Sequence, residues 1–465
     1  MFTMVTATRS TKKLSPRKKA IRTYESALKY LFGQTDYEQM LRVRYNRDTF
    51  NLDRMRMLLS ELGDPHTRLR AAHIAGTKGK GSTATMLAEM LRTCGYKVGL
   101  YTSPHICDVR ERIRVDGEMI SQAALTRLIC QVEPIIAKMA DKPTFFEIFT
   151  AMAFQHFASS GVDVAVVEAG LGGRLDSTNV LTPEVCGLTS ISLDHVHQLG
   201  DTPAKIAVEK AGIFKRDIPA ISVSQLPEVK RVLRKSARES GANLMFTGED
   251  IDFSYRVESS RTNGCHARIC LTTPRSRFEH LPVPLLGEHQ ALNCGLALAM
   301  LDQLKLKGYS QISDEKAIRG LSSVYIPGRM EIVHRDPRIL LDGAHNAASI
   351  QALMRAIGQH IPYDSMVMIF GCAADKDIQG MMQQISTGAD KVIFTRAASN
   401  PRAARPEDLA EMYEQCSGRV AQVTESLRSA MRIALNAVSR EDIICVTGSF
   451  YLVGEAKMVL GQGIA

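Results

Sequence analysis

The sequence predicts an α/β protein of two domains, built on mainly parallel, doubly wound sheets. Short apolar runs typical of strands alternate along the chain with amphipathic segments typical of helices, and this alternation indicates parallel sheets. Residues 252–285 interrupt the rhythm with short alternating segments, which predict a small antiparallel subsheet. The length of 465 residues also exceeds the size at which one hydrophobic core usually suffices.

The first domain is expected to span residues 25–326. Its predicted helices occupy residues 24–31, 52–62, 121–136, 145–157, 203–214, 229–240 and 290–304. Its predicted strands occupy residues 71–75, 97–102, 162–168, 185–190 and 220–223. After Pro327 and Gly328 the alternation begins again, so residues 327–465 are expected to form the second domain. The strands predicted there occupy residues 339–341, 366–370, 391–395 and 443–446.

The composition is ordinary for a globular enzyme, with 45% hydrophobic and 23% charged residues. No window reaches the roughly 18 apolar residues of a membrane span, so no membrane partner is expected. The ten cysteines form no close CxxC pair, which argues against a zinc or redox site. Reduced thiols in a cytoplasmic protein are the natural interpretation.

The positive charge is concentrated at the N-terminus. Residues 1–24 contain seven basic and no acidic residues, out of a net charge of +9 for the chain. A basic segment of this kind is most often disordered, and a disordered basic tail is expected here, with no nucleic-acid partner. A transit peptide and an arm that binds nucleic acid are the alternatives.

Residues 73–82 carry the strongest chemical signal. An apolar run ends at Gly76, and a stretch with three glycines in six residues leads into a helical pattern. Glycines let backbone N–H groups surround phosphates, while a lysine and a helix N-terminus add positive charge. The spacing departs from the standard Walker pattern, because Gly81 separates Lys80 from Ser82. The alternative is a tight turn with a solvated lysine.

The form of this loop, Gly-Thr-x-Gly-Lys-Gly-Ser, resembles that of the Mur ligase superfamily, and within it the folylpolyglutamate synthase and dihydrofolate synthase branch. Further motifs resemble the same family in the same order. They lie at residues 101–105, 111–113, 144–147, 168–179, 193–195, 200–202, 209–213, 327–329, 342–346 and 447–449. The resemblance implies a P-loop-containing Mur-ligase-type first domain and a smaller, Rossmann-like second domain, the glutamate ligase domain.

The activity implied by this resemblance is ATP-dependent addition of L-glutamate to dihydropteroate, to the γ-carboxylate of a folate, or to both, through an acyl phosphate. Residues 172–179 look like the bacterial form, in which both activities are often combined. The implied cofactor is Mg²⁺, as two ions, with ATP as co-substrate. The implied partners are these small molecules alone, and a monomer is expected.

The sequence leaves three alternatives to this activity. Another Mur-type ligase could act on a non-folate carboxylate, although the nucleotide-sugar members would need a further domain before the phosphate loop. A P-loop kinase would leave residues 342–346 unexplained. A nucleic-acid-binding protein would use the basic tail, and its binding would depend on salt.

Glu168 ends an apolar run and precedes a glycine-rich turn. It is therefore expected at the carboxyl edge of the sheet, where open α/β sheets bind ligands. A carboxylate there can hold Mg²⁺, or it can simply cap the turn. The resemblance implies that Glu168 and Ser103 bind one Mg²⁺ and that His195 binds a second. It also implies that Lys210 is carbamylated and supports the second ion.

The resemblance assigns the remaining sites residue by residue. The implied ATP-binding residues come from both domains: Gly79, Lys80, Gly81, Ser82, Asn293, Arg329 and Asp342. The implied pterin-binding residues come from three segments of the first domain: Thr49, Phe50, Asn51, Leu52, Thr144, Phe145, Phe146, Glu147, Leu175, Asp176 and Ser177. The aromatic members of this set could stack on a planar ring, although aromatic residues more often belong to a core. His345 and Ser449 are implied to bind glutamate, and Lys80, Lys210 and His345 to act in catalysis. Lys78 departs from the family, which usually has asparagine there, and adds positive charge beside the triphosphate.

Overall fold

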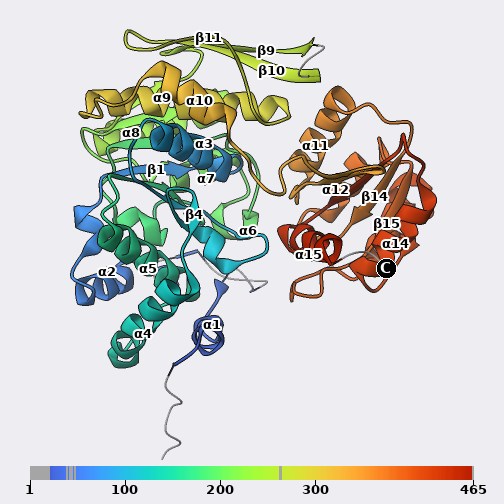
Figure 1. Ribbon diagram of the computed structural model, residues 1–465, viewed down its shortest axis with the longest axis horizontal. Helices are drawn as coiled ribbons and strands as arrows, with labels where there is room; N and C mark the ends of the chain where they lie inside the picture. Colours follow the sequence, from blue (N-terminus) through green and yellow to red (C-terminus); the bar gives the residue numbers. More distant parts are fainter. Residues whose placement is uncertain (1–20, 38–39, 41–44, 47–48, 261–263, 463–465) are drawn as a thin grey trace, which may run out of the picture.

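The computed structural model describes residues 21–37, 40, 45–46, 49–260 and 264–462. Within them, an eight-stranded and a six-stranded sheet form the centres of two domains, and a three-stranded sheet lies on the outside of the first (Figure 1). This arrangement confirms the α/β class, the two mainly parallel sheets and the antiparallel subsheet. The first twenty residues of the predicted basic tail lie outside the described residues.

The first domain contains helices α1–α10 and strands β1–β11. Its helices are α1 (Tyr24–Phe32), α2 (Leu52–Glu61), α3 (Lys80–Thr93), α4 (Gln122–Lys138), α5 (Phe145–Ser160), α6 (Val196–Leu199), α7 (Pro203–Ala211), α8 (Pro227–Ser240), α9 (Glu288–Leu306) and α10 (Asp314–Ser322). The strands of its large sheet are β1 (Ala71–Ala75), β2 (Val98–Tyr101), β3 (Ile113–Val115), β4 (Glu118–Met119), β5 (Val164–Glu168), β6 (Val185–Leu188), β7 (Pro219–Ser222) and β8 (Asn243–Phe246). The strands of the outer sheet are β9 (Asp252–Ser260), β10 (Gly264–Thr272) and β11 (Arg277–Pro282).

The predicted boundary of the tail at residue 24 falls inside structure. Thr23 is the N-cap of α1, and its side chain accepts a hydrogen bond from the backbone N–H of Ser26. The Ser26 hydroxyl in turn reaches the backbone N–H of Thr23, which forms a capping box. Residues 23 and 24 therefore belong to the first helix, and the prediction of a disordered segment up to residue 24 is wrong at this end.

The large sheet has the strand order β4-β3-β2-β5-β1-β6-β7-β8. Strands β2, β5, β1, β6, β7 and β8 are parallel, and only β3 and β4 are antiparallel to their neighbours. The sequence did not predict β3 and β4, because they are short and their side chains are mostly half-buried or exposed. The parallel central strands are buried along their whole length, which explains their continuous apolar runs.

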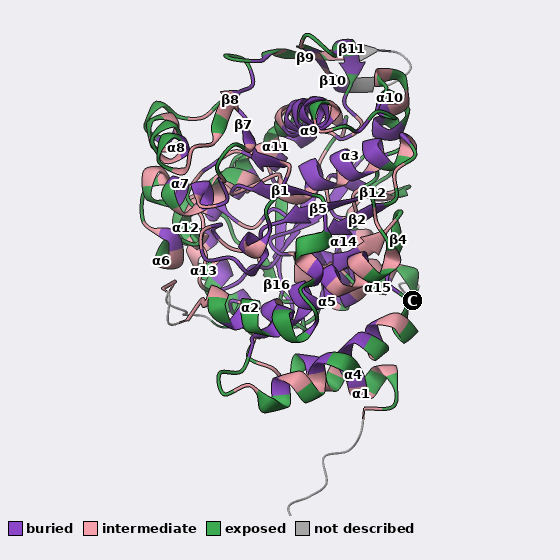
Figure 2. Cartoon of the chain, turned by 90° about the vertical axis from the view of Figure 1, so that its left-hand side faces the viewer, coloured by how far each residue is buried: buried purple, intermediate pink, exposed green. Residues whose placement is uncertain are grey.

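Helices cover both faces of the large sheet. Helices α3, α9 and α10 share one apolar core with the outer sheet, whereas α1, α2, α4 and α5 share another on the opposite face. Helix α9 lies between the large sheet and the outer sheet, so it is buried nearly all round (Figures 1 and 2). A side chain at Gly295 would collide with Phe253 of β9, so this glycine allows the outer sheet to approach the helix.

The second domain has the strand order β12-β13-β17-β14-β15-β16. Its strands are β12 (Glu331–Arg335), β13 (Arg338–Leu341), β14 (Met366–Phe370), β15 (Lys391–Phe394), β16 (Gln422–Val423) and β17 (Ile443–Thr447). Its helices are α11 (Ala347–His360), α12 (Ile378–Ser386), α13 (Pro406–Ser417), α14 (Leu427–Ala437) and α15 (Phe450–Gly461). Only β12 is antiparallel. The edge strands β12 and β16 escaped prediction because most of their side chains are exposed or half-buried.

No helix among the described residues is long and apolar enough to cross a membrane.

Candidate functional site

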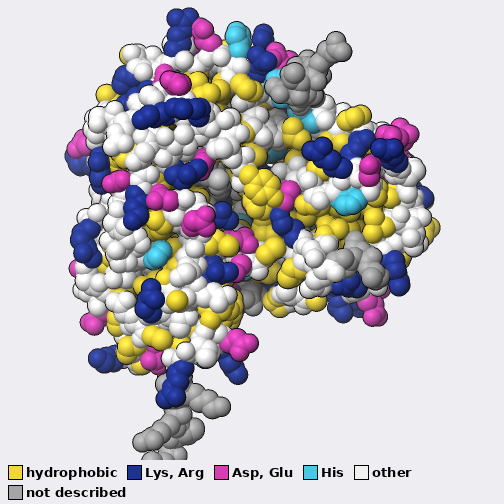
Figure 3. Space-filling view, in the orientation of Figure 1, with side chains coloured by type: hydrophobic (Ala, Val, Ile, Leu, Met, Phe, Trp, Pro, Cys, Tyr) yellow, Lys and Arg dark blue, Asp and Glu magenta, His cyan; other side chains and the backbone are white. Residues whose placement is uncertain are grey.

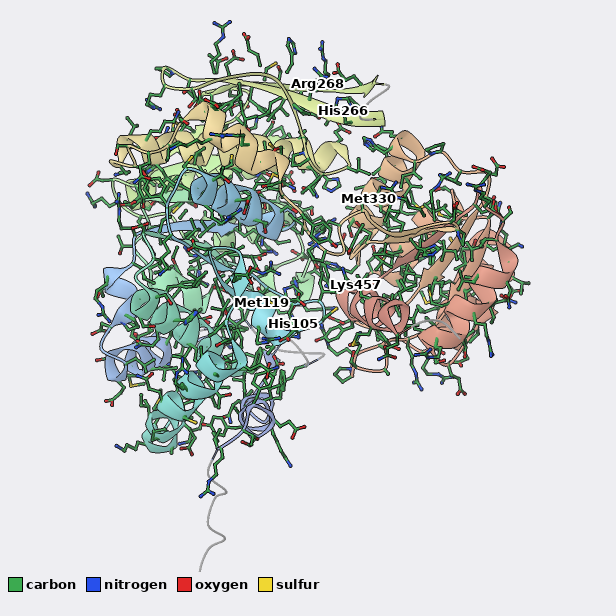
Figure 4. The ribbon with its side chains drawn as sticks, in the orientation of Figure 1. His105, Met119, His266, Arg268, Met330 and Lys457 are labelled. Atoms are coloured by element: carbon green, nitrogen blue, oxygen red, sulfur yellow. The ribbon has the colours of Figure 1, made fainter. Side chains whose placement is uncertain are left out.

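A cavity of about 610 Å³ lies between the two domains. Its walls come mainly from loops that follow the carboxyl ends of parallel strands in both sheets, which is where open α/β sheets bind ligands. On one face of the molecule a furrow separates the domains (Figure 3). His105 of the first domain and Met330 of the second lie on its two sides and both line the cavity (Figure 4).

The predicted phosphate loop connects β1 to α3 and lies in the cavity wall. A side chain on Gly76 would overlap the hydroxyl of Thr189, and one on Gly79 would overlap Asn293. Both glycines have positive φ, +145° and +89°. The backbone N–H of Thr77 donates to the carbonyl of Ser190 at 2.9 Å, which anchors the loop to the strand-end segment beside it.

Helix α3 begins at Lys80 and has no side-chain cap. Its first N–H groups are therefore available to an anion, and the helix N-terminus carries partial positive charge. Lys80, Gly81 and Ser82 all line the cavity. The loop thus has the strand–loop–helix order that the sequence predicts, and its binding of phosphate stays a prediction.

Glu168 lies beside the start of α3. Its carboxylate is 3% exposed, accepts a hydrogen bond from the backbone N–H of Ser103 at 3.0 Å, and lies 3.9 Å from the Lys80 ammonium. Burial raises the pKa of Glu168, and the positive charges of Lys80 and Arg329 and the Ser103 N–H oppose this rise. Within the described parts of the chain, the Ser103 N–H is the hydrogen-bond donor to this carboxylate, and Lys80 lies beyond hydrogen-bond distance.

The implied metal fits this donor set. No cluster of three or more His, Cys, Asp and Glu side chains capable of holding a metal occurs among the described residues. However, Mg²⁺ that bridges nucleotide phosphates commonly takes only one or two protein carboxylates and completes its shell with water. Glu168, with Ser103 next to it, meets that requirement.

His195 and Lys210 lie on the other side of the phosphate loop. The Lys210 ammonium is buried and donates to the carbonyl of Gly76 at 2.6 Å. Burial and the charge of Lys80 lower the pKa of Lys210 to about 7. Although 40% of the His195 side chain is open to the cavity, the surrounding protein and nearby cations lower its pKa to about 3. His195 is therefore neutral at neutral pH, the form that can bind a metal.

Asp342 and Arg329 form part of the second-domain wall. Asp342 follows β13, and its carboxylate accepts from the backbone N–H groups of Met330 and Ala344 at 2.9 and 2.8 Å. The Arg329 guanidinium stacks over the Phe450 ring, 4.6 Å from its centroid. Asn293, from the first domain, lines the same part of the cavity and donates to Gln290 at 2.9 Å.

The two residues predicted to bind glutamate also lie in this wall. His345 Nδ1–H donates to the carbonyl of Gly343 at 2.8 Å, which leaves Nε2 directed toward Asp194 at 3.8 Å. Ser449 follows β17 and caps α15, with its hydroxyl accepting from the N–H of Leu452 at 3.1 Å. Both residues line the cavity.

Asp194 joins the two domains and was not among the predicted site residues. Its carboxylate accepts from Lys376 Nζ at 3.0 Å and from Asn346 Nδ2 at 3.2 Å. Burial alone would raise the pKa of Asp194, but its neighbours, including Lys376 and His345, hold it well below its ordinary value. Lys376 could have been found as a polar residue shortly after the predicted strand at 366–370, at the same sheet edge as Asp342 and Ser449.

The predicted pterin-binding residues divide into two groups. One group lines the cavity: Phe50, Leu52, Thr144, Phe146, Glu147, Leu175, Asp176 and Ser177. The other group, Thr49, Asn51 and Phe145, does not line it. The Thr49 carbonyl accepts from Arg54, and Asn51 caps α2.

Phe145 corrects the prediction that both phenylalanines of α5 face a ligand. Phe145 is 1% exposed and stacks on Phe149 and Phe32, with ring centroids 5.6 and 5.8 Å apart. Consecutive helical residues point about 100° apart, so only Phe146 can face the cavity when Phe145 faces the core.

Glu147 is held by an arginine that the sequence prediction missed. Arg54 of α2 forms a two-pronged contact with it, Nε and Nη2 each 2.8 Å from a carboxylate oxygen. Both side chains are nearly buried. Glu147 also accepts from the backbone N–H of Thr144 in the capping box of α5. The 93-residue separation of the pair left no local signal in the sequence.

Two family profiles match the chain. The profile described as the Mur ligase middle domain matches residues 74–301, and the Mur ligase glutamate ligase domain matches residues 328–450. A dihydrofolate synthase/folylpolyglutamate synthase of Bacillus subtilis is 33% identical over 411 residues, which cover 87% of this chain and 94% of that protein.

Two solved structures are also similar. A Mycobacterium tuberculosis folylpolyglutamate synthase complexed with ADP has 32% identity and a TM-score of 0.83, covering 94% of this chain and 99% of that one. An E. coli FolC in complex with DHPP and ADP has 30% identity and a TM-score of 0.82, covering 96% and 99%.

Some relatives are much longer than this chain. A probable bifunctional folylpolyglutamate synthase/dihydropteroate synthase of Haloferax volcanii is 36% identical over 410 residues, which cover 87% of this chain. The match covers only 47% of that relative, and 48% of a similar protein of Halobacterium salinarum. The chain thus spans about half the length of these two relatives.

Proposed function

The chain belongs to the folylpolyglutamate synthase and dihydrofolate synthase family of Mur-type ligases, and we propose that it adds L-glutamate to dihydropteroate, to the γ-carboxylate of a tetrahydrofolate, or to both, at the expense of ATP. The observation that carries the proposal is the single cavity between the domains. It joins an uncapped helix N-terminus with Lys80 and Glu168, a second-domain wall with Arg329 and Asp342, and an aromatic wall with Phe146.

The reaction proceeds in two steps. An oxygen of the pterin substrate's carboxylate forms a bond to the γ-phosphorus of ATP as the bond to the β–γ bridging oxygen breaks, which yields an acyl phosphate and ADP. The α-amine of glutamate then attacks the activated carbonyl, loses a proton, and expels phosphate to form the amide.

The protein contributes positioning and charge rather than a side-chain nucleophile. Lys80 and the first N–H groups of α3 neutralise phosphate charge on one side of the cavity, and Arg329 does so on the other. Ser103 and Glu168 would hold one Mg²⁺ ion, with His195 and a carbamylated Lys210 supporting a second, and these ions would supply further charge neutralisation. Glutamate would bind against His345 and Ser449, and their position in the wall of the same cavity supports this role.

Burial and charge support the carbamate at Lys210. A carbamate forms when a neutral amine takes up CO₂, and the lowered pKa of Lys210, about 7, makes the neutral amine available near neutral pH. A free ammonium would repel Mg²⁺, whereas carbamate oxygens are ligands that this ion prefers.

One assay tests the proposed function. Release of ADP should require glutamate together with either dihydropteroate or tetrahydrofolate, and the product should contain one added glutamyl residue by mass spectrometry. Comparing the two pterins shows whether one or both activities are present. ATP turnover that is indifferent to pterins, or that prefers a different carboxylate acceptor, would overturn the proposal.

A further inference from the structure

The phosphate loop carries a second lysine, Lys78, that the proposed roles leave unused. Lys78 lines the cavity, and its Nζ is buried without a hydrogen-bond partner among the described residues. Burial lowers the pKa of Lys78 to about 8. A buried cation without an anion is costly, so this position stabilises the protein poorly unless a ligand supplies the negative charge.

The carboxylate that interacts electrostatically with Lys78 already has other hydrogen-bond donors. Asp194 is the carboxylate that acts on Lys78 electrostatically, but it accepts hydrogen bonds from Lys376 and Asn346. No ion pair within 4.0 Å joins Lys78 to a carboxylate in the described parts of the chain. The positive charge of Lys376 instead acts against that of Lys78. Lys78 and Lys376 together therefore leave this part of the cavity with excess positive charge.

Lys78 and Lys80 interact with different charged residues. Lys80 lies near Glu168 and acts electrostatically on Lys210, inside the first domain. Lys78 acts on Asp194 and Lys376 instead, at the junction with the second domain. The two ammonium groups, separated in sequence by Gly79, therefore have different charged neighbours, and those of Lys78 lie at the junction of the domains.

We infer that Lys78 binds the terminal phosphate of ATP from the side that faces the second domain and stays with this group during transfer. The inference rests on the proposed function, because it takes ATP as the ligand. The phosphoryl group in transit spreads its negative charge over three peripheral oxygens, and the unpartnered Lys78 ammonium in the cavity wall offers these oxygens a positive charge. Lys78 remains protonated throughout, so no proton is transferred.

The test compares nucleotides with and without the terminal phosphate. Affinities for ADP and for AMPPCP, a non-hydrolysable ATP analogue, are measured by calorimetry with Mg²⁺ for the wild type, Lys78→Gln and Lys78→Arg. The exposed Lys235→Gln serves as a matched control. Lys78→Gln should weaken AMPPCP binding about tenfold, equivalent to about 1.4 kcal/mol, and change ADP binding less than about twofold. Lys78→Arg should retain most of the difference between the two nucleotides.

A thermal unfolding measurement separates this role from a structural one. Without nucleotide, Lys78→Gln should unfold at the same or a higher temperature than the wild type, because it removes an unpaired buried charge. Equal weakening of ADP and AMPPCP, or weakening of neither, overturns the inference, as does a lower unfolding temperature accompanied by equal losses. If the wild type binds neither nucleotide, the proposed function itself fails instead.

Discussion

Two groups of buried charged residues in the cavity wall differ in how far the protein itself satisfies them. The phosphate half, defined by Lys78, Lys80 and Glu168, contains charged groups whose bonding capacity is not filled by protein. The ring half, defined by Glu147 and Asp176, contains carboxylates that the protein itself satisfies.

Asp176 shows how complete this satisfaction is in the ring half. One carboxylate oxygen accepts from the backbone N–H and hydroxyl of Thr178, and the other accepts from the N–H of Leu171 at 2.8 Å. Glu168, which is buried to a similar degree, has one backbone donor at 3.0 Å and a lysine 3.9 Å away. The difference supports the proposal that a charged ligand completes the phosphate half, whereas the carboxylates of the ring half already have their partners in the protein.

Substitution of the two buried glutamates, Glu147 and Glu168, tests this comparison most directly. Glu147→Ala removes the two-pronged partner of the buried Arg54, which keeps the exposed Asp141 as a carboxylate partner at 3.1 Å, and should destabilise the protein by about 3 kcal/mol, measured by urea unfolding. The matched Glu168→Ala should change stability by less than about 1 kcal/mol, because burial already disfavours its charge, yet should abolish most turnover. Similar losses of stability in both variants would contradict the distinction between the halves.

Lys80→Ala should have the next largest effect. Removing the charge that accompanies the phosphates should lower turnover at least about a hundredfold, or about 2.7 kcal/mol of transition-state stabilisation. Steady-state ADP release measures this, with circular dichroism to establish that the variant is folded. Near-normal turnover in a folded variant would contradict the prediction that this loop binds the phosphates of ATP.

Lys210→Ala should lower turnover between about tenfold and a hundredfold, and small carboxylic acids should restore part of it. In the wild type, the pKa of Lys210 is lowered from 10.5 to about 7, so the neutral amine predominates above about pH 7. Stripping CO₂ at pH 7.5 should therefore reduce activity, and bicarbonate should restore it. Full activity without CO₂, or a bare lysine in an active, metal-loaded crystal, would contradict the carbamate.

Asp176→Ala should act on one substrate only. The KM for the pterin substrate should rise about tenfold, close to 1.4 kcal/mol, while ADP affinity changes little. An equal loss of nucleotide affinity would show that Asp176 supports the phosphate half instead.

His73, which contacts Thr178 beside Asp176, should make stability depend on pH. Its Nε2 donates to Thr178 at 2.8 Å, and burial lowers its pKa from 6.5 to about 3. Between these values the unfolded chain binds more protons than the native protein, so stability should fall as pH falls, by at most about 1.4 kcal/mol per pH unit. His73→Gln should flatten this dependence between pH 6.5 and 5 in urea unfolding. Parallel curves for the two proteins would show that His73 does not titrate as described.

The contiguous parts of the site could be predicted from the sequence. The phosphate loop, Glu168 and Asp342 each follow an apolar strand, and parallel strands bring their carboxyl ends to one edge. The pairing of Arg54 with Glu147 and of Asp194 with Lys376 could not, because each joins segments separated by 93 and 182 residues.

The sequence pattern also could not predict the direction in which individual side chains point. Neighbouring Phe145 and Phe146 are equally apolar, and only the packing of α5 against Phe32 and Phe149 decides which one faces the cavity. Strands β3, β4, β12 and β16 were not predicted for a related reason, because these short strands at or next to a sheet edge lack the continuous apolar run that marks a buried strand.

The junction of the domains has a consequence for how the molecule responds to ionic strength. Among the described residues, two pairs of a carboxylate with a lysine or arginine cross it: Asp194 with Lys376 at 3.0 Å, and Glu288 with Arg355 at 3.8 Å. The first pair is nearly buried, with side chains 9% and 12% exposed, whereas the second has 39% and 60% of its side chains in solvent. Dissolved salt screens exposed pairs far more than buried ones. Rising salt should therefore loosen the outer pair first, so that the domains part from the surface inward.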